Sequence, residues 1–431
     1  MSGLLSAQET QSLTLSPDEA VELSLRNNLG LQSARVDTGT RRRASDLSWN
    51  QFVPNVTVAG TLNHLNREPM TMPGGPQWQA IATIQTSFNL NAAMFENMRR
   101  LRLDYETGIL SYNTARLQLE RDVRRTYNNM LLLQENIALL QESFQATSRV
   151  VDLAQANFLA GRAPELPFLQ AQVAMENMRP AVELAEYNLL LAMMQFAMLL
   201  GLSYHTPIEL VPVTETIEFV VREAPPPDAM QLISQAAARR PEIQELRHTI
   251  TMLESARRVQ SQSLLPNLSL SFSYNPVLLD PWNDSQFRQG GWNDQGSFSI
   301  TLGMRLHSLF PFSQDFQGIR NMDDQITTAV IGLTQLMQGT ELEIVNTLLS
   351  LERIRRTAQA QMHTVNLAER VHGLTESAFQ AGMQDLLQVQ NSELELRQAR
   401  FALLESQFSY LNGLLDLEYL IGVPFGTLSS R

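Results

Sequence analysis

The side chains that could do chemistry are scattered along this chain rather than grouped in motifs. Glu341 and Glu343, on a predicted helix, are two residues apart and lie on different faces, so they cannot act as a pair. Cysteine is absent, which excludes disulfides, thiolate metal sites and a cysteine nucleophile. The histidines show no metal-ligand spacing. They are His64, His205, His248, His307, His363 and His372. We therefore predict no catalytic site, no metal site and no cofactor.

Two groups of residues have a second interpretation. His372 takes a core position in a helical heptad near His363, so a pH-sensing role is the alternative to a packed histidine. Met193, Met194 and Met198 cluster as in a metal route, but a methionine stripe at helical spacing is typical of helix packing. We favour packing in both cases.

Composition limits the class of protein. The 431 residues have a net charge of -12, which argues against nucleic-acid binding because such proteins present a basic face. All 32 basic residues are arginine; codon bias is the simplest explanation, and we have no physical account of it. No apolar run reaches about 18 residues, so no transmembrane helix is predicted. The nearest candidate, Leu189–Leu202, is interpreted as a buried helix end.

The sequence is duplicated, and the duplication constrains the architecture more than any motif does. Residues 31–62 align with residues 243–274 at one constant offset. Further on, the segment FLAG that ends at Gly161 aligns with FQAG that ends at Gly382. Each half predicts the same order of elements: helix, strand, loop, strand, very long helix, hairpin and helix.

Four segments alternate between apolar and polar side chains. Each is roughly ten residues or more, which suits a tilted strand that crosses a bilayer. A soluble half-buried sheet also alternates, but the polar faces here are small and uncharged, as in a wet lumen. Trp49, Trp78, Trp282 and Trp292 lie in or beside these segments, where membrane-interface aromatics gather. Four strands cannot close a barrel and lipid does not tolerate an open edge, so we predict an oligomer.

Two predicted helices are too long for a globular core. Residues 93–160 and 319–381 contain no proline, and at about 1.5 Å per residue each extends on the order of 90–100 Å. A seven-residue spacing of core positions predicts coiled-coil packing of both. The positions are Val123, Met130, Ile137, Phe144, Val151 and Phe158 in the first helix, and Ile344, Leu351, Ala358, Val365, His372 and Phe379 in the second.

These patterns divide the chain into five parts. Residues 1–15 are predicted to be an N-terminal segment with the remnant of a secretory signal peptide. The first repeat, 16–202, has strands at 54–65 and 78–90, a long helix at 93–160 and a return helix at 166–200. An equatorial segment and linker follow at 203–228. The second repeat, 229–422, has strands at 266–275 and 292–306, a long helix at 319–381 and a return helix at 385–421. Residues 423–431 are a C-terminal tail.

Three segments carry a resemblance to a known family: LSPDEA at 15–20, LPNLSL at 265–270 and AGMQDLLQVQN at 381–391. With the alternating strands, the long hairpins and the duplication, the chain resembles the TolC-type outer-membrane efflux proteins over nearly its whole length. The resemblance implies a membrane α+β fold, in which a transmembrane β-barrel sector of four strands per subunit continues into a long periplasmic α-helical coiled-coil barrel.

The resemblance also implies partners and a location. The protein would be a homotrimer in the outer membrane of a diderm bacterium, in contact with outer-membrane lipid and extending into the periplasm. A periplasmic adaptor and an inner-membrane pump of the RND or ABC type would dock on it. Together they would export small molecules or secreted proteins. A soluble coiled-coil scaffold or adaptor is the alternative, but it would not explain four strands with tryptophan at their ends.

By the same resemblance, two sites lie at the hairpins. Residues at the hairpin tips would contact the adaptor: Ala160, Gly161, Arg162, Ala381, Gly382 and Met383. In many relatives an apolar residue follows the glycine, and Arg162 departs from this. Pro164 and Pro167 also suggest that the first tip is bent differently from the second.

The pore entrance, the periplasmic constriction, would be lined by Asp385, Gln388 and Asn391. TolC presents acidic rings there, whereas this chain aligns amides with them and keeps Asp385 as the nearby carboxylate. Since amides offer hydrogen bonds without charge, we expect a weakly ion-selective entrance. The alternative is that Gln388 and Asn391 only cover a polar helix face.

Overall fold

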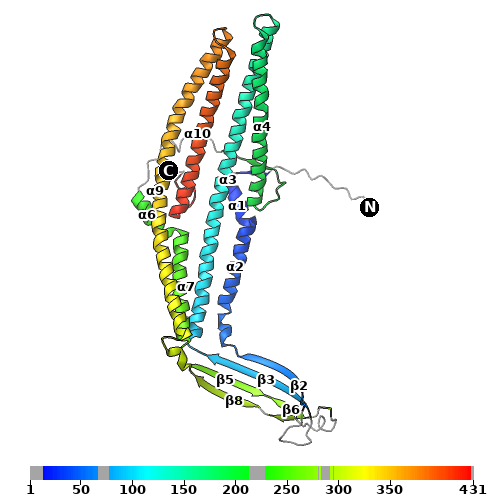
Figure 1. Cartoon of the computed structure of the whole chain (residues 1–431), viewed down its shortest axis with the longest axis vertical. Helices are drawn as coiled ribbons and strands as arrows, with labels where there is room; N and C mark the ends of the chain where they lie inside the picture. Colours follow the sequence, from blue (N-terminus) through cyan, green and yellow to red (C-terminus); the bar gives the residue numbers. More distant parts are fainter. Residues whose placement is uncertain are drawn as a thin grey trace. The chain divides into compact units, whose positions relative to one another are not determined.

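The structure is a computed structural model that describes residues 13–66, 77–212, 229–279, 281–282, 292–294 and 296–428 (Figure 1). The chain divides into two compact units. Unit 1 comprises Met1–Val36, Leu110–Gln244 and Gln335–Arg431, and unit 2 comprises Asp37–Ile109 and Glu245–Thr334. Each unit is described by itself below.

The elements follow the duplicated order of the sequence. The first half contains β1 (Leu13–Leu15), α1 (Pro17–Asn27), α2 (Leu29–Asp46), η1 (Ser48–Phe52), β2 (Asn55–His64), β3 (Trp78–Leu90), α3 (Ala93–Leu159), α4 (Glu165–Leu199) and β4 (Ile208–Leu210). The second half contains α6 (Ala229–Arg239), α7 (Pro241–Gln262), β5 (Asn267–Tyr274), β6 (Pro276–Leu279), β7 (Trp292–Asp294), β8 (Ser297–Gly303), η2 (Leu306–Leu309), α9 (Gln314–Gln380) and α10 (Leu386–Ile421).

The sheet of unit 2 is antiparallel, with the order β7-β6-β3-β5-β8, and β2 pairs with the other edge of β3. One predicted strand is wrong: residues 292–306 form β7 and β8, followed by η2, rather than one strand. Pro276 offers an explanation. It lacks an N–H and so divides β5 from β6. The facing strand divides at the same level, because β7 pairs with β6 and β8 pairs with β5.

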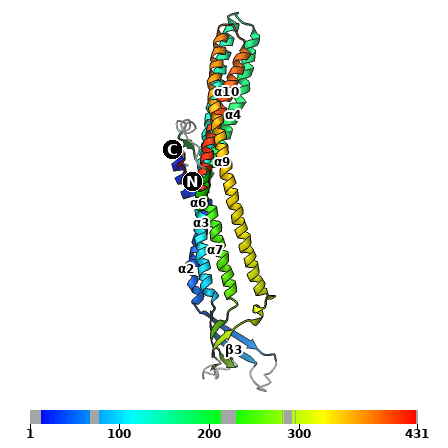
Figure 2. The ribbon, with the colours of Figure 1, turned by 90° about the vertical axis from the view of Figure 1, so that its left-hand side faces the viewer.

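Helices α2, α3 and α7 run close together in unit 2 (Figure 2), and arginine–carboxylate pairs hold them to one another. Arg41 of α2 lies 2.9 Å from Asp104 at the start of α3. Arg258 of α7 lies 3.3 Å from Glu96 of α3. These contacts place α2 and α7 beside the α3 segment that follows the sheet, so the two repeats meet at α3 in this unit.

Unit 1 contains a two-stranded parallel sheet that pairs β1 with β4, with Leu13 opposite Ile208. The buried Tyr127 of α3 fixes it, because its hydroxyl lies 2.8 Å from the carbonyl oxygens of Leu15 and Val211. Burial raises the pKa of Tyr127. Residues 13–15 are therefore part of the fold, which corrects their assignment to an N-terminal signal remnant; residues 1–12 lie outside the described residues.

The segment LSPDEA begins α1 for a clear local reason. The Ser16 side chain accepts from the Glu19 N–H, and the Glu19 carboxylate accepts from the Ser16 N–H at 2.8 Å, which forms a capping box. Pro17 follows at the first helical position, where an N–H has no helical partner in any case. The hydrogen bonds from Ser16 lower the pKa of Glu19.

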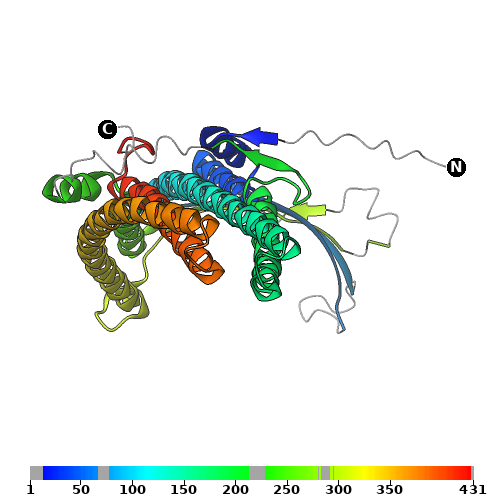
Figure 3. The same ribbon diagram turned by 90° about the horizontal axis from the view of Figure 1, so that it is seen from above.

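Four long helices of unit 1 lie side by side in the order α9, α10, α3, α4 (Figures 1 and 3). Polar contacts support this order. Asn412 of α10 accepts from Asn128 of α3 at 3.0 Å, and Gln141 of α3 donates to Glu186 of α4 at 2.9 Å. Along α3 and α9 the heptad positions Val123, Met130, Ile137, Val151, Ile344, Leu351 and Ala358 are buried.

The repeat is visible in how both return helices end. Gly201 after α4 and Gly422 after α10 take the left-handed conformation, with φ of 73° and 66°. Each lies against a backbone carbonyl of the preceding short helix. A Cβ on Gly201 would lie 2.3 Å from the Asn27 oxygen, and one on Gly422 would lie 2.8 Å from the Arg239 oxygen. Only glycine fits either position.

A polar contact also ties α7 to α10 within unit 1. The Tyr419 hydroxyl donates to the Glu242 carboxylate and accepts from Gln118 at 3.1 Å. Burial and the hydrogen bond to Glu242 raise the pKa of Tyr419 to about 12. The phenol therefore stays protonated and keeps donating at any physiological pH.

Candidate functional site

The sheet has one apolar and one polar face. The register of the strands mostly places apolar side chains opposite apolar ones and polar side chains opposite polar ones. On one face Val58 is opposite Ile84, which is opposite Tyr274. These side chains are open to the surroundings: Val58 is 75% exposed and Leu302 is 74% exposed. So large an exposed apolar surface is typical of a face that contacts lipid or another chain.

The other face carries hydroxyl and amide groups in matching rows. Ser271 and Ser299 are opposite each other with their hydroxyl oxygens 2.7 Å apart, and Ser269 donates to Asn89 at 2.6 Å. None of the strands β2, β3, β5 and β8 contains an acidic or basic residue other than His64. This face can hold water without selecting strongly for the sign of an ion.

Aromatic rings lie at the sheet end that holds Trp78. Trp78 is opposite His64, with their ring centroids 4.6 Å apart, and it contacts the Trp282 ring edge-on at 6.1 Å. The backbone of Trp292 belongs to β7, but its side chain lies outside the described residues.

The opposite sheet end has its own aromatic residues, where strands join helices. Trp49 lies in η1, before β2, so it is not at the end that holds Trp78 and Trp282. Sequence reasoning missed its companions here. The Phe52 and Phe95 rings are 5.5 Å apart, and Phe310 and Phe312 stack at 5.3 Å. The sequence did contain a signal for these phenylalanines, because each lies within a few residues of the end of a predicted strand.

Both hairpin tips form the same turn. Gly161 and Gly382 have φ of 68° and 75°, and the next residue returns a hydrogen bond to the helix. Arg162 donates to the Asn157 carbonyl and Met383 donates to the Ala378 carbonyl, each at 2.8 Å. This is the Schellman pattern, which needs a left-handed residue after the helix. Ala160 and Ala381 immediately precede these glycines, and all six predicted tip residues are exposed.

The expected difference in bending between the tips is not present in these turns. Pro164 occupies the N-cap position of α4 and Pro167 lies in its first turn, where a missing N–H costs little. The equivalent of Pro164 in the second tip is Asp385, whose carboxylate accepts from the Gln388 N–H at 3.0 Å. The halves therefore differ in how the return helix is capped.

Asp385, Gln388 and Asn391 are exposed and three residues apart, so they share one face of the start of α10. The residues that follow Asp385 and Gln388, Leu386 and Val389, are buried on another face. The structure thus brings the three predicted entrance residues together on an open surface. Whether that surface lines a pore stays a prediction.

A polar link joins the two hairpins further along the helices. Arg400 of α10 lies 3.2 Å from Glu142 of α3 and 2.9 Å from Glu369 of α9. Burial opposes its charge, but the hydrogen bond to Glu369 and the charge of Glu142 raise the pKa of Arg400. Sequence reasoning missed this link because its partners are far apart along the chain.

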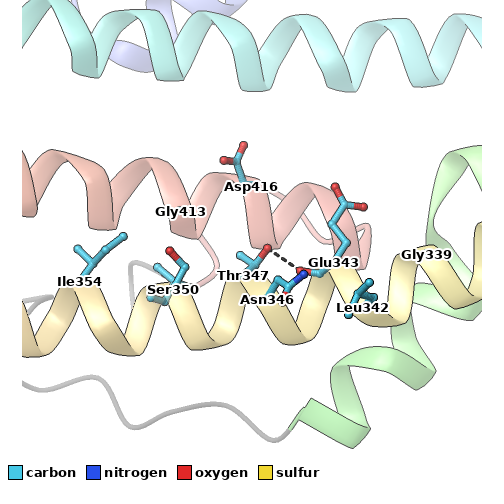
Figure 4. A pocket seen from close by; sticks show the side chains of 10 residues that line it. Gly339, Leu342, Glu343, Asn346, Thr347, Ser350, Ile354, Gly413 and Asp416 are labelled. Carbon is cyan, nitrogen blue, oxygen red and sulfur yellow. Dashed lines mark hydrogen bonds between the residues drawn. The ribbon is translucent and has the colours of Figure 1, made fainter.

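A groove of about 430 Å³ lies between α9 and α10 (Figure 4). Gly413 of α10 lines it, and so do two carboxylates, Glu343 of α9 and Asp416 of α10. Burial raises the pKa of Asp416. Glu343 is held by Arg240 at 3.0 Å, so the two carboxylates have separate partners and do not form an acid–base pair. Among the described residues, no group of three His, Cys, Asp or Glu side chains could hold a metal.

By length and composition, α4 could cross a membrane, and this differs from the prediction that no helix would qualify. Only 11% of its most apolar window is buried. The end of α4 packs into the core, where Phe196 and Leu200 are fully buried near β1 and β4. The prediction that residues 189–202 form a buried helix end is therefore correct for only part of this segment, since Leu190 and Met198 are exposed.

Comparisons with known proteins agree with this geometry. A model of the family described as outer membrane efflux protein matches residues 20–202 and 232–423. The chain is 21% identical over 421 residues to nodulation protein T of Rhizobium leguminosarum bv. trifolii, covering 92% of this chain and 84% of that protein. It is 21% identical over 414 residues to the toluene efflux pump outer membrane protein TtgC of Pseudomonas putida, covering 94% and 82%.

A solved structure has the same fold. The CmeC outer membrane channel of Campylobacter jejuni superposes with a TM-score of 0.77 at 16% identity, covering 94% of this chain and 85% of that one. The arrangement of helices and strands is thus shared with this channel. The chain belongs to the outer membrane efflux protein family, and its place is in the outer membrane as the exit duct of an efflux system.

Proposed function

We propose that three copies of this chain form one outer-membrane exit duct, with the four-stranded sectors closing a barrel of twelve strands. The observation that carries the proposal is the two-faced sheet with open edges. Among the described residues, β2 pairs only with β3 and β8 pairs only with β5. Lipid does not tolerate unpaired backbone groups, so the β2 edge of one copy has to pair with the β8 edge of the next.

The helices support the same assembly. The row of four helices in unit 1 has two outer members, α4 and α9 (Figure 3). Both present apolar side chains that no other described residue covers. On α4 they are Leu166, Leu169, Val173, Leu184, Tyr187 and Leu191, and on α9 they are Leu342, Leu349, Leu367, Val371 and Leu374. Most neighbours in these two lists are three, four or seven residues apart, which is the spacing of a coiled-coil seam, so α4 of one copy would pack on α9 of the next.

The aromatic residues at the two sheet ends support the placement in the membrane. Trp78 and Trp282 would mark one interface with water, and Trp49 with Phe95 would mark the other. The apolar face between them would contact outer-membrane lipid. Trp292 is proposed to join the first group.

The hairpin tips would bind the periplasmic adaptor. Both expose a glycine turn of the same shape, with Arg162 in one and Met383 in the other. An adaptor that binds both tips therefore meets a cation at one and an apolar side chain at the other. An inner-membrane pump of the RND or ABC type would complete the export system. The cargo would be small molecules, since a relative is named for toluene efflux.

The entrance would be lined by Asp385, Gln388 and Asn391 and would be closed mainly by helix packing. In this role the chain is a passive duct without catalysis. Conductance of the purified oligomer in planar bilayers tests this: we expect open events of weak ion selectivity. Strong cation selectivity that disappears in Asp385→Asn alone would contradict the neutral entrance. A protein that dissolves in buffer without detergent and forms no channel would favour the scaffold alternative.

A further inference from the structure

One core heptad position near the hairpin tips differs in kind between the two halves. The alignment of Gly161 with Gly382 pairs Val151 with His372 and Ala171 with Ser392. In the first half Val151 and Ala171 are buried and belong to one apolar cluster. The second half replaces this apolar contact with a histidine and a hydroxyl. A polar substitution at a packed seam costs stability unless its hydrogen bonds are made.

His372 makes two such contacts, both to the start of α10. Its Nδ1 lies 3.1 Å from the Ser392 hydroxyl, and its Nε2 lies 3.1 Å from the Glu393 carboxylate. The His372 and Glu393 side chains are 17% and 18% exposed, so water screens the pair only in part. The imidazole therefore joins α9 to α10 within five turns of the second tip.

Both partners of His372 are acceptors. The Ser392 hydroxyl donates its hydrogen to the Val389 carbonyl at 2.9 Å, so it can only accept a hydrogen bond from the ring. A carboxylate can only accept. A neutral imidazole has one N–H and satisfies one of these partners, whereas the imidazolium has two and satisfies both. The geometry thus fits the protonated ring.

The charged groups around the ring come from three helices. A cavity of about 50 Å³ beside His372 is also lined by Glu376 from α9, by Arg149 from α3 and by Glu393 from α10. The nearby part of α4 contributes apolar side chains. Two carboxylates and one guanidinium leave this pocket able to hold one further positive charge. The amide nitrogen of Gln390 is buried there without a hydrogen-bond partner, and the cavity has room for a water.

We propose that protonated His372 clasps α10 to α9 behind the second hairpin tip, and that loss of the proton releases this clasp. The second hairpin is then the pH-responsive half of the entrance, and the first hairpin, with Val151, is the constant half. The clasp is present while the ring is protonated, which low pH favours, and it is lost when the ring gives up its proton. Its role at an entrance rests on the proposed function, but the clasp itself does not.

Hydrogen exchange of the purified full-length protein in detergent tests the clasp. Wild type and His372→Val are compared at about pH 5.5 and about pH 8. At each pH the ratio of their exchange rates is taken in peptides from 365–395, so the intrinsic effect of pH on exchange cancels. We expect His372→Val to exchange about fivefold faster than wild type at the lower pH, and about equally at the higher pH.

Three further variants sharpen the result. His363→Val, at an exposed histidine on the same helix, is the matched control. Its exchange rates should equal those of wild type at both pH values. Glu393→Gln removes the charge partner and should also abolish the pH effect. The triple variant H372V, S392A, E393Q gives the second half the residues that the first half has at Val151, Ala171 and Gln172. It tests the clasp even if the single valine at 372 packs poorly.

A ratio for H372V that is the same at both pH values would overturn the proposal, as would an equal effect of H363V. The measurement needs no channel activity. Absence of conductance in bilayers would therefore count against the proposed duct and leave the clasp standing, whereas unchanged exchange would count against the clasp alone.

Discussion

Val58 and Thr57 are neighbours on β2 that face different surroundings. Alternation turns every second side chain to the same face, and the register places Val58 opposite Ile84 but Thr57 opposite Gln85. One of these neighbours therefore belongs to the apolar face and the other to the polar one. A single strand thus supplies its own matched pair of test positions.

We predict that Val58→Arg impairs insertion into lipid while Thr57→Arg is tolerated. A cation on the lipid face near the middle of a membrane costs about 2–4 kcal/mol, whereas a cation in a wet lumen keeps its water. Folding yields into lipid vesicles, measured by protease protection, separate the two. Equal yields would mean that the apolar face does not contact lipid.

Glu418 is a buried carboxylate that holds the chain end. It accepts from the N–H groups of Gly426 and Leu428, at 2.9 and 2.6 Å, so residues 424–428 fold back on α10. Glu418→Ala leaves both N–H groups without this partner, and we expect a loss of about 1–3 kcal/mol of unfolding free energy. Thermal unfolding with Glu418→Gln as the partial rescue measures it.

The same residue predicts a pH dependence. Burial raises the pKa of Glu418 in spite of the two N–H groups, so the folded state binds a proton more tightly than the unfolded state. Stability from this group is therefore highest below the ordinary glutamate pKa and falls as the pH rises through it. Relative to Glu418→Gln, wild type should lose thermal stability as the pH rises above the ordinary glutamate pKa of about 4. A constant difference would contradict this.

At the level of elements, the left-handed glycines separate turn geometry from packing. Gly161 and Gly201 have nearly the same φ, 68° and 73°. A Cβ on Gly161 would meet nothing within 4 Å, whereas one on Gly201 would meet the Asn27 carbonyl. Backbone strain is common to both positions, and only the second has a steric clash.

We predict that Gly201→Ala destabilises the protein by about 1–3 kcal/mol more than Gly161→Ala does, because overpacking adds to the strain of about 1–2 kcal/mol. Gly422→Ala should behave like Gly201→Ala, since it lies against the Arg239 carbonyl. Chemical unfolding of the three variants compares them. Similar losses at Gly161 and Gly201 would show that backbone conformation alone sets the cost.

Sequence alone was sufficient for the periodic features of these elements. Alternation gave the faces of β2 and β5, and the heptads gave buried residues such as Ile344 and Leu351. The sequence was insufficient where a structural feature depends on which segments pair with each other. The division of residues 292–306 into β7 and β8 follows from which strand each part faces, and the Arg400 link follows from contacts between distant segments.

The candidate sites divide in the same way. Glycine turns at Gly161 and Gly382 were readable, because a helix that ends at a glycine has few alternatives. The capping role of Asp385 was not foreseen, since a carboxylate there could equally face a pore. The partners of His372 come from α10, and no spacing within α9 reveals them.

At the scale of the whole molecule, the exposed seams of α4 and α9 predict how copies associate. Leu184→Glu with Leu191→Glu should weaken the trimer by on the order of a hundredfold or more, because each buried leucine contributes about 1.5–3 kcal/mol. Leu184→Met with Leu191→Met keeps both seam positions apolar and of similar volume, and should leave the trimer intact. Native mass spectrometry in detergent measures the oligomer. A trimer that survives the double change would place the interface elsewhere.

The two edges of the sheet are different surfaces, and this has a genetic consequence. A copy whose β2 edge is disrupted, for example by proline at positions of β2 whose N–H groups point away from β3, still offers an intact β8 edge. Such a copy can join two normal ones, but the ring that results cannot close. With equal expression and random mixing, only about one trimer in eight would contain normal copies alone. The defect should therefore be dominant over the normal gene. In a monomeric channel the same defect would be recessive, because normal copies would work alone.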